Sequence, residues 1–107
     1  MGDISNSVGV RDLTLSNGNT VTVSIGLPSF VSEGEFVCPY RIAGLQAEEV
    51  GRAIGSDALQ ALQLALIRVG AILYTSEAWK DGVLSWNGDK DLGFPLPGSI
   101  KDLQGSA

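Results

Sequence analysis

Residues 57–75 carry the most regular apolar pattern in the chain, and this pattern limits what the rest can fold into. Apolar residues recur there at steps of three and four, the spacing of an amphipathic helix: Leu59, Leu62, Leu66, Val69 and Leu73. Ser56 or Asp57 can cap this helix, and Gln60 follows Asp57 at capping-box spacing. We therefore predict one helix over residues 57–75, with its leucine-rich stripe packed on a sheet.

Two segments of alternating character before the helix predict a β-hairpin. Residues 20–25 alternate at period two and residues 10–15 alternate in part, as half-buried strands do. The Asn17-Gly18 pair between them is a strong hairpin signal. Residues 36–42 predict a third strand, in which Cys38 and Tyr40 share a face.

Residues 46–54 are compatible with two structures. Their composition suits a short helix, whereas glycines near both ends bracket a segment of strand length. We favour a fourth strand. After the helix, residues 83–86 predict a short last strand, and residues 93–98 are expected to be extended or irregular.

The expected fold class is therefore α+β. We predict an antiparallel sheet of about four strands, built as an N-terminal meander and packed by one long helix. A short C-terminal strand or extended tail follows. At 107 residues the chain is expected to form a single domain over residues 1–107, with residues 1–8 and about 98–107 flexible.

The charge balance is acidic. Seven basic and twelve acidic side chains give a net charge of −5, and the basic residues are scattered along the chain. Nucleic-acid binding requires a basic patch, so we expect no nucleic-acid partner. A basic protein partner is compatible with this charge, although solubility is the simpler explanation.

The chain shows no membrane or export signal. Its first residues lack the basic start and apolar stretch of a signal peptide, and the longest strictly apolar run is residues 64–67. We expect a cytoplasmic protein with no membrane partner.

The residue types available limit the chemistry. The chain has no histidine, which removes histidine-dependent nucleophilic systems and most zinc sites. The one cysteine, Cys38, has no basic neighbours and is expected to be a buried structural thiol. Glycine-rich phosphate loops are absent, and the paired carboxylates are expected to be solvated. We therefore expect no enzyme, cofactor or metal site.

The outer surface of the predicted helix raises a question about partners. At about 100° per residue, its polar stripe is narrow: Ser56, Gln60, Gln63, Gly70 and Tyr74. Ile67 falls inside this stripe and Leu64 beside it, with Arg68 nearly the only charge nearby. Either the C-terminal segment with Trp86, Phe94 and Leu96 covers this flank, or the flank is a homodimer or partner interface.

Two groups of candidate binding residues follow. The candidate interaction residues are Leu64, Ile67, Arg68, Trp86 and Phe94. Asp57, Gln60 and Tyr40 form a candidate polar site, although helix capping is the simpler explanation for the first two.

Three parts of the sequence resemble a family of small uncharacterised bacterial proteins. They are the Cys38-Pro39 strand, the helix start at residues 55–62 and the Gly-Phe-Pro at residues 93–95. The resemblance covers about residues 20–95 and implies a strand-rich first half followed by the helix. It implies no catalytic residue. The function most compatible with all of this is a non-catalytic protein-binding module, immunity-like or another interaction protein, and the alternative is a small-ligand-binding or accessory domain.

Overall fold

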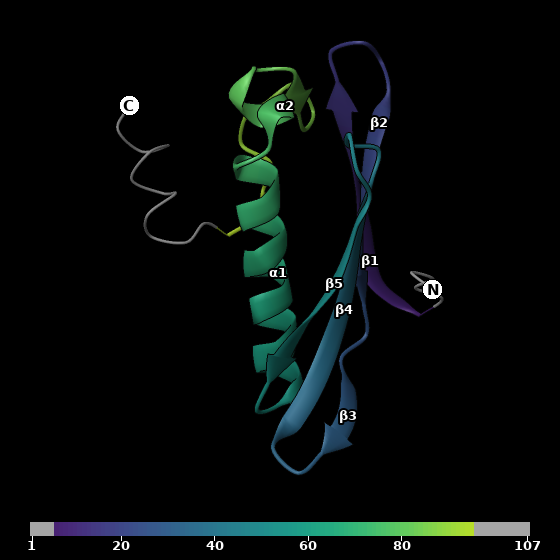
Figure 1. Ribbon diagram of the computed structural model, residues 1–107, viewed down its shortest axis with the longest axis vertical. Helices are drawn as coiled ribbons and strands as arrows, with labels where there is room; N and C mark the ends of the chain where they lie inside the picture. The colour runs from purple at the N-terminus through teal and green to yellow at the C-terminus, as the bar shows by residue number, and fades with distance from the viewer. Residues whose placement is uncertain (1–5, 96–107) are drawn as a thin grey trace.

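The computed structural model describes residues 6–95 and has one antiparallel sheet with one main helix along one of its faces (Figure 1). The elements are β1 (Ser7–Leu15), β2 (Thr20–Gly26), β3 (Ser29–Ser32), β4 (Glu35–Ala43), β5 (Glu49–Gly55), α1 (Ala58–Tyr74), α2 (Glu77–Lys80) and β6 (Leu84–Ser85). The α+β class is confirmed.

The strand order follows from the pairing. β4 pairs with β5 along one edge, and with β2 and then β3 along the other. β2 pairs with β1, and β6 adds two residues beside the end of β1. The sheet therefore runs from β5 through β4 and β2 to β1, with six strands where about four and a short C-terminal strand were expected.

One strand, β3, was not predicted, and both its absence from the prediction and its formation have physical causes. The Asn17-Gly18 hairpin and the strand at residues 46–54 are confirmed, with Gly18 at φ 92° in the turn and β5 over Glu49–Gly55. β3 was missed because its four residues are all exposed and show no alternation of burial. It exists because Gly34, at φ 74°, closes a tight turn that brings the chain back along β4.

The face that α1 turns to the sheet differs from the prediction. The residues buried along α1 are Ala61, Ala65, Val69, Gly70, Leu73 and Tyr74. Leu59 is 76% exposed, so the prediction that it faces the sheet is wrong. Small residues lie at the contact because α1 approaches β4 and β5 closely: a Cβ on Gly55 would lie 2.4 Å from the Ala61 nitrogen.

The start of α1 is capped as predicted, with one difference. Asp57 is the N-cap, and its carboxylate accepts a hydrogen bond from the Gln60 backbone nitrogen at 2.8 Å. The Gln60 side chain accepts from the Ser56 nitrogen, one residue before the cap. Both polar side chains therefore satisfy free backbone donors of the first turn.

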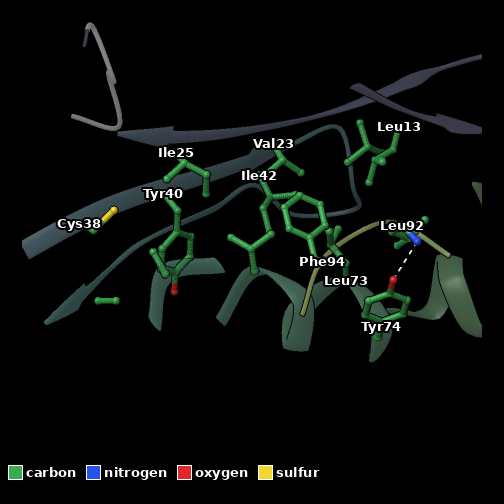
Figure 2. Packing of buried hydrophobic residues seen from close by; sticks show 14 of the residues in the cluster. Leu13, Val23, Ile25, Cys38, Tyr40, Ile42, Leu73, Tyr74, Leu92 and Phe94 are labelled. Carbon is green, nitrogen blue, oxygen red and sulfur yellow. Dashed lines mark hydrogen bonds between the residues drawn. The ribbon is translucent and has the colours of Figure 1, made fainter. Parts of the chain in front are cut away.

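The segment after β6 returns across the helix. A tight turn at Asn87 and Gly88, both at positive φ, sends the chain back toward α1. Leu92 and Phe94 are buried, and Phe94 lies among the core residues between sheet and helix (Figure 2). Pro95 crosses α1 at Gly70, where a Cβ would lie 2.2 Å from the Pro95 oxygen.

One prediction about the outer surface of α1 needs correction here. Gly70 and Tyr74 do not belong to an exposed polar stripe, because the returning segment buries both. Residues 7 and 8 belong to β1. Residues 1–5, residues 98–107 and Leu96 lie outside the described part.

Candidate functional site: the groove between β1 and α1

An apolar groove separates β1 from α1. α1 packs on β4 and β5 and leaves the β1 side of the same sheet face uncovered. The groove has a volume of about 210 Å³, and its lining residues are Val8, Gly9, Val10, Arg11, Val23, Ile25, Leu62, Leu66 and Phe94. We call this feature the β1–α1 groove.

Leucines from the predicted stripe of α1 form one wall of the groove. Leu62 and Leu66 are half-buried and line the groove. Leu59, one turn earlier on the same side, is the most exposed large apolar residue of the described chain. Part of the stripe that was expected to contact the sheet therefore faces an opening.

Gly9 forms the open part of the opposite wall. It pairs with Ile25, and because directly paired residues point to the same face, a side chain at position 9 would project into the groove. A Cβ added there would meet nothing within 4 Å. The groove is therefore wide enough at this point to accept a side chain.

Arg11 closes one end of the groove. Its Nη1 donates to the Leu92 and Gly93 carbonyls, both at 3.1 Å. The guanidinium carbon lies 3.9 Å from the Trp86 ring centroid and 4.9 Å from that of Phe94. Arg11 thus fastens the returning segment to β1 by two hydrogen bonds and two cation–π contacts.

Tyr74 holds the other side of the returning segment. Its hydroxyl accepts from the buried Leu92 nitrogen at 2.8 Å (Figure 2). The same hydroxyl donates to the Asp91 carboxylate at 3.2 Å. Burial, more than the nearby Asp91 charge, raises the pKa of the Tyr74 hydroxyl. The segment that ends the groove is therefore attached both to the sheet and to the helix.

The backbone of β1 is open along the groove. The Leu15 nitrogen donates to Asn19 toward β2, whereas the Ser16 nitrogen donates to Val83 toward β6. Hydrogen-bonding direction alternates along an antiparallel strand, so the backbone groups of Val10 and Asp12 point away from β2. β6 reaches only to Thr14, so no described strand pairs with this stretch of the edge.

The candidate interaction residues fall into two separate places. Trp86 and Phe94 meet at Arg11, where they close the groove. Leu64, at 36% exposure, and the exposed Arg68 lie on the side of α1 away from the groove. Ile67 is half-buried and does not line the groove. Sequence reasoning treated these residues as one surface, and the structure does not bring them together.

The candidate polar site is not assembled as an open cluster. Tyr40 is 6% exposed, and its ring lies against Gly51, where a Cβ would be 2.4 Å from the Tyr40 hydroxyl oxygen. Asp57 and Gln60 act at the first turn of α1. Arg11, Gly9 and Val10, by contrast, were not identified from the sequence, because nothing local marks an arginine whose partners lie about 80 residues away.

Cys38 is buried, as predicted. Its Sγ donates to the Gly26 carbonyl at 3.3 Å, and burial raises the pKa of the thiol. It lies in the core of the sheet and not in the groove (Figure 2).

We predict that Cys38 reacts slowly with a thiol reagent in the native protein and rapidly in denaturant, because thiolate formation is disfavoured in the core.

The raised pKa of Cys38 also makes the stability of the protein depend on pH. The thiol loses its proton near pH 8.5 in the unfolded chain but keeps it at that pH in the native state. The free energy of unfolding should therefore fall as pH rises above about 8.5. Urea titrations at several pH values should show a shallower fall for Cys38→Ala; equal slopes would contradict this account.

A comparison with family models places the chain. A model for a domain of unknown function, DUF6968, matches residues 9–96. The chain belongs to the DUF6968 family. Searches of curated proteins and of solved structures give no match. The DUF6968 region takes in almost the whole groove, from Gly9 on β1 to Phe94 at its closed end.

No helix within residues 6–95 of this DUF6968 protein has the length and apolar character needed to cross a bilayer.

Proposed function

We propose that this protein is a non-catalytic protein-binding module and that the β1–α1 groove is its binding site. The observation that carries the proposal is that Leu62 and Leu66 line an open groove, with the exposed Leu59 one turn earlier on the same side of α1. Exposed apolar surface of this kind marks interaction sites in soluble proteins, because leaving it in water costs about 25 cal/mol per Å².

The size of the groove supports a protein partner over a small ligand. Ligand sites typically enclose about 300–1,000 Å³ and present several convergent polar groups. The groove is smaller, at about 210 Å³, and its one polar side chain, Arg11, is occupied by carbonyls and aromatic rings. A second hollow, between residues 45–49 and the start of α2, is larger at about 560 Å³ but is lined mostly by exposed residues.

A groove-filling substitution tests the proposal. Gly9→Leu places an apolar side chain in the groove without a steric conflict at its Cβ, so the variant should fold and should lose the partner. Val50→Leu is the matched control, because Val50 is 55% exposed on the opposite face of the sheet. Binding by the control should equal that of the wild type.

The measurement is affinity capture from the native host, quantified by mass spectrometry for all three proteins. We expect the wild type and Val50→Leu to retain the same host protein in equal amounts. Gly9→Leu should retain at least about ten-fold less of it, which corresponds to a loss of 1.4 kcal/mol or more in binding free energy. Retention that is equal in all three proteins would contradict the proposal.

A further inference from the structure

We infer that the partner binds as an extended strand that adds to the open edge of β1 and places apolar side chains in the β1–α1 groove. This inference rests on the proposed function and names the kind of partner. Strand addition needs an edge with free backbone groups, and it gains specificity from a depression beside that edge. β1 has both over the same residues.

The free edge is a consequence of how β6 ends. β6 pairs with β1 only at Thr14 and Leu15, and the turn at Asn87 and Gly88 then takes the chain off the edge. The N–H and C=O groups of Val10 and Asp12 are left pointing outward. A strand placed there would lie on the same edge of β1 as β6 and would extend the pairing beyond Thr14.

The alternation of side chains predicts what this strand carries. A residue opposite Gly9 would face the groove, whereas a residue opposite Asp12 would face the other side of the sheet. The first position calls for a large apolar side chain, because a Cβ at Gly9 meets nothing within 4 Å. The second favours lysine or arginine beside the exposed Asp12 carboxylate.

A second copy of this chain does not fit the groove. If β1 of another molecule paired antiparallel with β1, its residues on the groove side would be Gly9, Arg11 and Leu13. Gly9 has no side chain, Arg11 is held by Trp86 and Phe94, and Leu13 is fully buried in its own core. The groove would remain empty, so we assign it to a different protein.

The test uses linear random peptides displayed on phage and selected against the full chain. We expect the selected peptides to carry apolar residues at alternate positions. Methylation of the peptide backbone nitrogen should weaken binding about ten-fold at every second residue and about two-fold or less at the residues between, because only alternate N–H groups reach β1. Apolar residues spaced by three and four, uniform methylation effects, or no peptide that distinguishes the wild type from Gly9→Leu would overturn the inference.

Val10→Pro tests the edge from the protein side. The Val10 nitrogen points away from β2, so proline there leaves the β1–β2 hydrogen bonds intact but blocks an incoming strand. Val10→Thr keeps the N–H and is the control. We expect the selected peptides to bind Val10→Pro at least about ten-fold more weakly than they bind Val10→Thr.

The two proposals fail in different ways. If the host partner is lost with Gly9→Leu but retained by Val10→Pro, strand addition is wrong and the groove is still the binding site. If no host protein depends on the groove, the proposed function itself is wrong. Should Val10→Pro not fold, as judged by circular dichroism, the methylation series alone decides.

Discussion

Replacing Gly55 with alanine should destabilise the protein by about 3 kcal/mol or more, whereas the same change at Gly9 should be neutral or stabilising by up to about 1 kcal/mol. Both glycines face the helix side of the sheet, in β5 and β1. At Gly55 the new methyl group would lie within 3.0 Å of three backbone atoms of α1. These atoms belong to the helix itself and cannot move without displacing it.

The contrast between the two alanine variants reports where α1 touches the sheet. Contact with β5 makes the first substitution costly, and the open groove makes the second harmless. Urea unfolding followed by circular dichroism measures both free energies. Similar costs at the two positions would show that α1 covers β1 as closely as it covers β5, and the groove would then not exist in solution.

Replacing Arg11 with alanine should lower the free energy of unfolding by about 2–4 kcal/mol. The variant loses two hydrogen bonds to the carbonyls of Leu92 and Gly93, together with the contacts to Trp86 and Phe94. Those interactions join residues more than 70 positions apart, so their loss releases the segment that closes the groove.

Two further variants identify the cause. Arg11→Lys keeps the charge but not the planar guanidinium, so its free energy of unfolding should fall between those of the wild type and Arg11→Ala. Arg52→Ala removes an exposed arginine on the opposite face and should change the free energy by about 0.5 kcal/mol or less. An Arg11→Ala variant as stable as Arg52→Ala would show that the contacts around Arg11 contribute little.

The elements that the sequence predicted are those with a local signal. The Asn17-Gly18 hairpin needs only a turn that tolerates positive φ and alternation on either side. The helix start needs only Asp57 and Gln60 at capping spacing. A strand at residues 46–54 was favoured over a helix because glycines bracket a segment of strand length, and β5 forms there at Glu49–Gly55.

The buried face of the helix was predicted only in part, for a physical reason. Periodicity shows that leucines share a side of α1, but it does not show what lies opposite that side. Ala61 and Ala65 contact the sheet because only small residues allow so close an approach, and this requirement arises from Gly55 on another element. Leu62 and Leu66 consequently lie beside this contact and line the groove.

Local sequence patterns also could not predict the contacts that close one end of the groove. Trp86 and Phe94 were named as candidate interaction residues, but their shared partner Arg11 lies near the other end of the sequence. Gly9 and Val10 carry no chemical signal either. Their importance follows from strand pairing. Gly9 has no atom within 4 Å of an added Cβ, and the backbone groups of Val10 point away from β2.

The central claim is that a partner occupies the β1–α1 groove, and methyl nuclear magnetic resonance of the full chain with the captured partner tests it most directly. The methyl signals of Val23, Ile25, Leu62 and Leu66 should shift or broaden on binding, while those of Val50 and Ile54, on the opposite face, should stay in place. Shifts confined to Val50 and Ile54, or to Leu64 on the far side of α1, would contradict the account.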